Sequence, residues 1–361
     1  MTEKLENIET AIEASQKAVV SREKEIGEDA ELPRGPVGLD IGTSHIVMSQ
    51  NKGKHIHTVK QLNAFFTIPY SKFTKKILNE NDISFYEKNN LFYILGYSAE
   101  SFANMFNTNT RRTMEKGLLS AREVEGITVL QAIIETLIKR SEKHGDIICF
   151  SLPGDPINAP NSVVYHESIL KMFLSSLGYQ PISINEGLAT VMSELAHDNF
   201  TGIGISMGGG MCNVCLSYLS VPVITYSIQK GGDYIDYMVG VSIGEPGTTV
   251  KVIKEGGLNL AKPPKSRLET ALNIYYEDLV MSLLQSMESV LKSSDKIPKI
   301  AKPTPIVLSG GTVLPNGFQE VFERALKIVD IPLDISEVRI ARDPLNTTAK
   351  GAMVMALSEV I

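Results

Sequence analysis

Three short glycine-containing turns each follow a strand-like run of apolar residues, and they carry residue types that bind phosphate. They are Asp40-Ile41-Gly42-Thr43-Ser44, Ser206-Met207-Gly208-Gly209-Gly210 and Ser309-Gly310-Gly311-Thr312. The backbone N–H groups and hydroxyls of such turns can point at an anion. One of them alone would be ordinary turn chemistry. Three of them, in this order along the chain, predict a phosphate clamp between two lobes.

The elements that must position these turns alternate between strands and helices, which predicts an α/β fold. Apolar patterning predicts strands at 37–41, 146–152, 181–184 and 202–207, and helices at 124–137, 162–177 and 186–196. A second cycle follows, with a hairpin across 213–229, a helix from Gly232, a long helix over 267–292, a strand at 305–309, a helix over 317–329, a short strand near 339–340 and a last helix from about 347. Because the second cycle repeats the order of the first, we expect two related α/β lobes.

The same pattern gives the expected boundaries of the lobes. We expect a first lobe over 37–200 and a second over 201–361, with the C-terminal helix returning to the first lobe. Residues 61–117 are rich in aromatic residues and lack a clean helical period, and about 241–300 interrupts the second cycle. Each lobe is therefore predicted to carry an inserted small subdomain.

The composition is that of an ordinary soluble globular protein, with 43% hydrophobic and 21% charged residues in 361. Its 35 Lys and Arg and 41 Asp and Glu give a net charge of −6, so no global basic field is available to hold nucleic acid. No apolar stretch approaches the roughly 20 residues of a membrane helix, and no signal-peptide core is present. With three cysteines, Cys212-x-x-Cys215 is interpreted as buried strand packing, and the protein is expected in the cytoplasm.

Residues 1–36 differ from the rest, with 5 Lys or Arg, 9 Asp or Glu and no aromatic residue. Seven positions at alternating spacings of three and four follow the pattern of a helix seam, and five of the seven are apolar: Leu5, Ile8, Ile12, Ser15, Val19, Arg22 and Ile26. This predicts an amphipathic helix ending at Gly27, followed by a linker. The helix is either solvated or loosely docked, or it binds a partner protein or a second copy. Its acidic polar face disfavours membrane attachment.

The three turns belong to a series of seven longer motifs, which are distributed along the chain from Val37 to the C-terminal helix. They are Leu39 to Ser44, Ile184-Asn185-Glu186-Gly187-Leu188-Ala189-Thr190, residues 203–215, Gly231-Gly232-Asp233-Tyr234-Ile235-Asp236, Ile243-Gly244-Glu245, Ile306 to Leu314, and Ala341-Arg342-Asp343-Pro344 through Ala352. In this order they resemble the first phosphate loop, first connecting segment, second phosphate loop, G-G-D-x-x-D, I-G-E, adenosine segment and closing segment of one superfamily. That superfamily contains actin, Hsp70 and the sugar kinases. Within it, the chain resembles most the bacterial actins of the MreB and MamK branch.

The resemblance implies an actin-like fold of two lobes with ATP or ADP and Mg²⁺ in the cleft between them. It implies that Asp40 holds Mg²⁺ through water and that Glu186 orients the attacking water. The alternative to a catalytic role is that Glu186 is an ordinary acidic residue in the first turn of a helix, where the helix dipole favours negative charge. The residues that the resemblance assigns to the nucleotide are Gly42, Thr43, Ser44, Gly208, Gly209, Gly210, Gly232, Asp233, Glu245, Lys251, Gly310, Gly311 and Thr312, with Lys254 as an alternative to Lys251.

The second phosphate loop departs from the superfamily pattern D-x-G-x-G-T. Ser206 stands where the Asp would help to hold the Mg²⁺ waters, and Met211 replaces the Thr. The glycines of the loop remain, so nucleotide binding through backbone N–H groups is expected. Because Ser cannot supply the negative charge of the Asp, efficient hydrolysis is left open.

Three functions are compatible with these residues. The first is an ATP-binding cytoskeletal protein that assembles head to tail into filaments under nucleotide control. The second is an actin-like scaffold or binding protein that keeps nucleotide without efficient hydrolysis. The third, a small-molecule kinase, would need a carboxylate base near the second phosphate loop, and Ser206 and Asn213 disfavour it.

Overall fold

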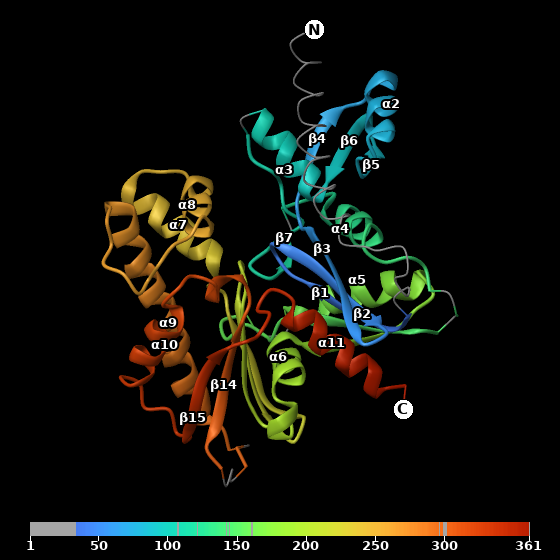
Figure 1. Ribbon diagram of the computed structural model, residues 1–361. Helices are drawn as coiled ribbons and strands as arrows, with labels where there is room; N and C mark the ends of the chain where they lie inside the picture. Colours follow the sequence, from blue (N-terminus) through green and yellow to red (C-terminus); the bar gives the residue numbers. More distant parts are fainter. Residues whose placement is uncertain are drawn as a thin grey trace.

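Two five-stranded sheets form the centres of two lobes in the computed structural model (Figure 1). The structure describes residues 34–360 apart from 107, 121, 142, 144, 160, 161, 296 and 299–301. Each sheet contains a meander of three antiparallel strands whose first strand also pairs with a parallel strand. The prediction of two related α/β lobes is therefore confirmed. The predicted N-terminal helix over residues 5–26 lies outside the described residues.

The first sheet has the order β10-β9-β1-β2-β3. Its strands are β1 (Arg34–Ile41), β2 (His45–Lys52), β3 (His55–Leu62), β9 (Ile147–Leu152) and β10 (Gln180–Asn185). Alternate residues of β1 face opposite sides of the sheet. Leu39 and Ile41 share a buried apolar cluster with helices α4 (Gly126–Glu135) and α5 (Val163–Ser176), while Gly38 faces the C-terminal helix on the other side.

The second sheet has the order β13-β12-β11-β14-β15. Its strands are β11 (Gly202–Met207), β12 (Cys212–Tyr218), β13 (Val221–Ile228), β14 (Thr304–Ser309) and β15 (Ile335–Ile340). Its larger apolar cluster includes residues of α7 (Gly232–Ile243), α8 (Gly247–Glu255), α9 (Arg267–Ser293) and α10 (Phe318–Leu326). Short 3-10 turns lie at Ala196–Asp198 and Gly311–Val313. Cys212 and Cys215 are free and buried in β12, as expected from the sequence.

Between β3 and α4 the chain forms a separate small sheet of β4 (Phe65–Pro69), β5 (Phe85–Lys88) and β6 (Leu91–Leu95). Helices α2 (Lys72–Glu80) and α3 (Gly96–Met105) accompany it, and the hairpin β7 (Met114–Glu115) and β8 (Leu118–Leu119) follows. The aromatic residues of this region form its own core, around Phe92 and Phe102. We did not predict α2 and α3 because these short helices sit among aromatic residues. The available signal for α2 was Ser71, a residue type favoured at helix N-caps, and in the structure its hydroxyl oxygen accepts from the Thr74 N–H.

Helices α6 (Glu186–Glu194) and α11 (Thr347–Ser358) lie between the two sheets (Figure 1). α11 packs on β1, and α6 packs on β11 and β12. Their backbones approach each other so closely that a Cβ at Gly351 would overlap with the backbone of Ala189. A Cβ at Gly187 would likewise meet the backbone of Cys215. The two sheets are therefore joined through a pair of helices in backbone contact.

Among the described helices, none combines the length and the apolar character needed to cross a membrane.

The close contact of α6 and α11 gives a prediction for stability. Gly351→Val should lower the free energy of unfolding by about 1–3 kcal/mol, the usual cost of overpacking, because α11 must move away from α6. Chemical denaturation measures this change. Ser358→Val, at an exposed position of the same helix, is the control and should change stability by less than about 0.5 kcal/mol. Equal stability of Gly351→Val and the parent would contradict the close contact.

Candidate functional site

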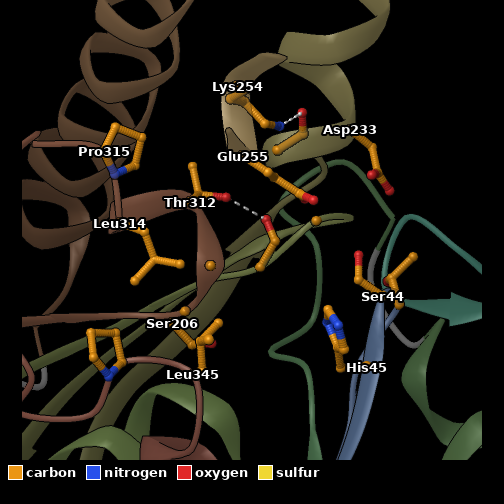
Figure 2. Close-up of a pocket in the computed structure, with 18 of the residues that line it drawn as sticks. Ser44, His45, Ser206, Asp233, Lys254, Glu255, Thr312, Leu314, Pro315 and Leu345 are labelled. Atoms are coloured by element: carbon orange, nitrogen blue, oxygen red, sulfur yellow. Dashed lines mark hydrogen bonds between the residues drawn. The ribbon is translucent and has the colours of Figure 1, made fainter. Parts of the chain in front are cut away.

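A cavity of about 400 Å³ opens between the two lobes, and the three glycine turns meet there. Figure 2 shows Ser44 and His45 on one side of it and Leu314, Pro315 and Leu345 on the other. Of the residues singled out from the sequence, it brings together Asp40, Gly42, Thr43, Ser44, Glu186, Gly208, Gly209, Gly232, Asp233, Lys251, Gly310, Gly311 and Thr312. Gly210 and Glu245 are not among its lining residues.

Hydrogen bonds within the first lobe fix the first turn, residues 42–44. The Gly42 N–H donates to the carbonyl of His45 at 3.0 Å, and the Asn63 amide donates to the carbonyl of Gly42 at 2.9 Å. The Thr43 hydroxyl accepts from the N–H of Gly117, at the tip of the β7–β8 hairpin, at 3.0 Å. The turn is thereby positioned without a ligand.

The second turn is tied to α7 and to the third turn. The carbonyl of Gly208 accepts from the Gly232 N–H at 3.0 Å and from the Thr312 hydroxyl at 2.9 Å. The carbonyl of Gly209 accepts from the Asp233 N–H at 2.8 Å. The second and third turns and the start of α7 therefore form one hydrogen-bonded unit on the second lobe.

Gly210 lies outside the cavity lining, in close contact with the first turn and the β7–β8 hairpin. A Cβ there would overlap with the Thr43 hydroxyl and with the backbone of Gly117. Its missing side chain therefore lets the first turn, the second turn and the β7–β8 hairpin pack together at the edge of the cavity.

An ion pair crosses from this hairpin region to α7. The Arg112 guanidinium lies 2.7 Å from the Asp233 carboxylate, and both side chains are partly exposed. The two residues belong to different lobes and are 121 positions apart, so no local pattern indicates the contact. It is the principal site contact that sequence reasoning missed.

Two partly buried carboxyl groups lie close together in the cavity wall. Asp40, at the end of β1, accepts a hydrogen bond from the Ser151 hydroxyl at 2.7 Å. Burial raises the pKa of Asp40 to about 6, and the Ser151 hydrogen bond opposes the rise. Glu186 begins α6, where the Asn185 side chain caps the helix. Burial and the neighbouring Asp40 charge raise the pKa of Glu186 to about 8.

Glu186 is held by two neutral donors from the second sheet. Its Oε2 accepts from the Ser206 hydroxyl at 3.0 Å and from the Asn213 amide at 2.9 Å. Ser206 and Asn213 are directly opposite on β11 and β12, so both side chains reach the same face. Asn213 also accepts from the Gly154 N–H at 2.9 Å, which fixes the amide orientation. The predicted hairpin across 213–229 pairs β12 with β13 and did not indicate this contact. The available signal was the glycine turn at 208–210, where the chain reverses between β11 and β12.

The part of the cavity next to α8 is more apolar. Leu258, Leu314, Pro315 and Leu345 line it, together with the polar side chains of Lys251, Lys254 and Glu255. The buried Lys254 ammonium lies 2.7 Å from the Asp236 carboxylate and donates to the Gly232 carbonyl at 3.0 Å, so it is structurally engaged. Lys251 is free of such burial and pairs only at 3.9 Å with Glu255. Lys251 and Glu255 are therefore the charged groups able to meet a ligand here.

The carboxylates fit a hydrated magnesium ion better than a metal held by protein alone. The described residues contain no group of three or more His, Cys, Asp or Glu side chains placed to hold a metal. Asp40 and Glu186 nevertheless put two carboxyl groups on one wall of the cavity, where a cation would relieve their mutual repulsion. Mg²⁺ commonly keeps several waters and uses one or two carboxylates plus phosphates.

Two α/β lobes with a cleft between them lined by three glycine turns have the arrangement of the actin-like fold. The profile of the Volactin family matches residues 36–356, and the chain belongs to that family. The chain is also similar to the actin-like protein MamK of Paramagnetospirillum magneticum, at 21% identity over 91% of this chain and 94% of that protein. The resemblance to the MreB and MamK branch is thus confirmed.

Solved structures show the same fold. The chain is similar to the MamK double helical filament, with a TM-score of 0.67 and 18% identity over 89% of this chain and 98% of that one. It is also similar to MreB5 of Spiroplasma citri bound to ADP, with a TM-score of 0.62 and 15% identity over 90% and 97% of the two chains. The actin-like fold inferred from the motifs is confirmed.

The raised pKa of Glu186 gives a prediction for pH dependence. Its folded-state pKa of about 8 exceeds the ordinary value of 4.5, so the protonated form favours folding and this contribution is lost as pH rises through about 8. In protein free of nucleotide and metal, the melting temperature should fall between about pH 4.5 and pH 8 and level off above pH 8, because the unfolded chain ionises this carboxyl group first. Glu186→Gln, which keeps the acceptor oxygen but cannot ionise, should flatten this fall. Parallel curves for the two proteins would contradict burial of an ionisable Glu186.

Proposed function

We propose that this protein is an actin-like cytoskeletal protein that binds ATP or ADP with Mg²⁺ and assembles into filaments under nucleotide control. The observation that carries the proposal is the convergence of three glycine turns from two lobes on one cavity of about 400 Å³. The cavity has a polar end with two carboxyl groups and a more apolar end, which suits a ligand with phosphates at one end and a base at the other.

The nucleotide is proposed to lie with its phosphates at the first and second turns. Gly42, Thr43 and Ser44 would face the phosphates from the first lobe, and Gly208 and Gly209 from the second. Gly310, Gly311 and Thr312 would lie beside the nucleoside, where Leu314 and Leu345 offer apolar contacts and Lys251 and Glu255 offer polar ones. Gly210 and Glu245, both assigned to the nucleotide from the sequence, are left out of this contact set because neither lines the cavity.

Mg²⁺, when bound, would neutralise phosphate charge and help to ionise the neighbouring carboxyl groups. Asp40 would hold it through water from the end of β1. Glu186 would orient a water molecule for attack on the terminal phosphate, and Ser206 and Asn213 would fix the Glu186 carboxyl group for that task. These two donors share one oxygen, Oε2, which leaves Oε1 free to contact water.

Assembly is proposed as a head-to-tail contact between copies, which repeats along a filament. Support comes from the relatives, because MamK forms a double helical filament. The ADP complex of MreB5 supports the nucleotide part of the proposal in the same way. The Arg112–Asp233 ion pair already joins the two lobes at one edge of the cleft, and a nucleotide bound between the lobes would hold them in this one shape for assembly.

A second function is favoured by one specific observation. Ser206 replaces the expected Asp, and it donates a hydrogen bond to Glu186 at 3.0 Å without adding charge for a cation. A scaffold that keeps nucleotide with little hydrolysis would have such a site. Phosphate release measured alongside electron microscopy, with ATP and with ADP, separates the two functions: release coupled to filament turnover favours the first, and stable filaments without release favour the second.

Nucleotide binding has a direct test in thermal stability. ATP with Mg²⁺ should stabilise the native protein by about 2.7 kcal/mol at a concentration of 100 times Kd, and the melting temperature should rise accordingly. Asp40→Asn should weaken the Mg²⁺-dependent part of this rise, whereas Asp198→Asn, at an exposed carboxylate outside the cavity, should preserve it. No rise at millimolar ATP in the parent protein would remove the nucleotide proposal.

The missing acidic residue can be restored. Ser206→Asp should increase Mg²⁺-dependent phosphate release by roughly tenfold or more, equivalent to about 1.4 kcal/mol of barrier, because it adds a second carboxylate to the cation's water shell. Ser206→Asn, similar in size but uncharged, is the control and should give no increase. The gain should vanish when Asp40→Asn is added. Rapid release by the parent, unchanged in Ser206→Asp, would show that the Asp is compensated elsewhere.

A further inference from the structure

The solvent face of α5 carries an apolar stripe that nothing in the described part of the chain covers. Val164, Tyr165 and Met172 are 59%, 62% and 70% exposed, and Ser168 lies between them. Their spacings of three, four and seven place them on one side of the helix. The opposite side is the buried one and includes Leu170 and Phe173. α5 is thus apolar on both sides, which is unusual for a helix that faces only water.

Exposed basic residues lie at the C-terminal end of this stripe. α5 is followed by Gly178 and Tyr179, which hydrogen-bond to the segment 139–145. Lys139, Arg140 and Lys143 of that segment are all exposed, against one acidic residue in 139–143. An occupant of the stripe would therefore meet positive charge at this end.

The chain enters the described structure at the same end of the sheet. Val37 of β1 pairs in parallel register with Ile148 of β9, and Gln180 at the start of β10 pairs with Ile147. The start of β1 therefore lies two strands, about 10 Å, from the start of β10, just after α5 ends. Residues 27–33 can span about 23 Å when extended, which is enough to reach from Arg34 to the helix layer.

The segment before Arg34 has the complementary chemistry. Its apolar seam from Leu5 to Ile26 would extend over about 33 Å as a helix, against about 21 Å for the 14 residues of α5. Residues 1–36 contain nine acidic and five basic residues, so the segment is opposite in charge to the basic residues beside α5. The stripe and the segment thus match in apolar character, charge and position.

We infer that residues 5–26 dock as a helix along α5 and cover Val164, Tyr165 and Met172, with acidic side chains near Lys139, Arg140 and Lys143. The contact is within one chain and is separate from the nucleotide cavity, which α5 does not line. Its consequence is an additional helix on the outer face of the first lobe, where it would shield an apolar surface from other proteins. Loss of the segment would expose that surface.

The absence of Trp from the sequence allows a direct test, because Met172→Trp introduces a single indole reporter. In the full-length chain without nucleotide, its emission should lie at shorter wavelength, and acrylamide should quench it at least about twofold less than in the same variant lacking residues 1–30, since a covered indole is shielded. Ile328→Trp, at a position that is 75% exposed on the second lobe, is the control and should be unaffected by the deletion.

Two further measurements keep the inference testable if the shortened chain fails to fold. Ile12→Asp in full-length Met172→Trp should shift the emission to longer wavelength, as the deletion would. High salt should weaken the shielding, because the charge contact is exposed. Emission that is already that of an exposed indole in the full-length chain would overturn the inference. Shielding that appears only as protein concentration rises would also overturn it, since the occupant would then be a second copy.

Discussion

The backbone contact between α6 and α11 is the constraint on which the rest of the structure depends. Each helix packs on a different sheet, and the two meet where Gly351 lies against Ala189. Side chains at this contact are small, so the distance between the sheets is set by backbone atoms, which cannot adapt by changing rotamer. The relative position of the two lobes is therefore fixed at the base of the cleft, while the hairpin and ion pair hold its edge.

The chemistry of the cavity follows from that contact. α6 begins with Glu186 and α11 begins at Thr347, and residues at the start of both helices line the cavity, including Thr348. The same pair of helices that joins the sheets thus places one carboxyl group facing the second lobe and closes the wall near Leu345. Asp40 reaches this place because β1 ends there, beside the Ser151 hydroxyl on β9. The contact that sets the relative position of the two lobes therefore also sets the positions of the cavity residues.

Much of this could be predicted from the sequence, because turns and strand ends are local features. The order of strands and helices and the duplicated lobes follow from apolar periodicity, and the three turns follow from their glycines. Cavity residues outside those turns, such as Glu186, Asp233 and Lys251, were assigned through the resemblance to the actin superfamily. What could not be predicted depends on pairing between distant segments. Arg112 and Asp233 meet only because the two lobes fold against each other, and Gly210 serves packing because the hairpin tip at Gly117 arrives beside it. Glu245 was assigned from a motif, yet it lies beyond the end of α7, outside the cavity lining.

The substitution at Ser206 has a consequence for the site before any ligand binds. With Asp at this position, three carboxyl groups would share one buried wall, and like charges at such distances cannot all ionise without a cation. Ser206 and Asn213 instead donate hydrogen bonds to Glu186, which stabilises its acceptor oxygen and adds no charge. The wall is therefore less strained without a cation, and less attractive to one. In the proposed nucleotide complex, the negative charge that a magnesium ion requires would therefore come from Asp40, Glu186 and the phosphates, without a contribution from position 206.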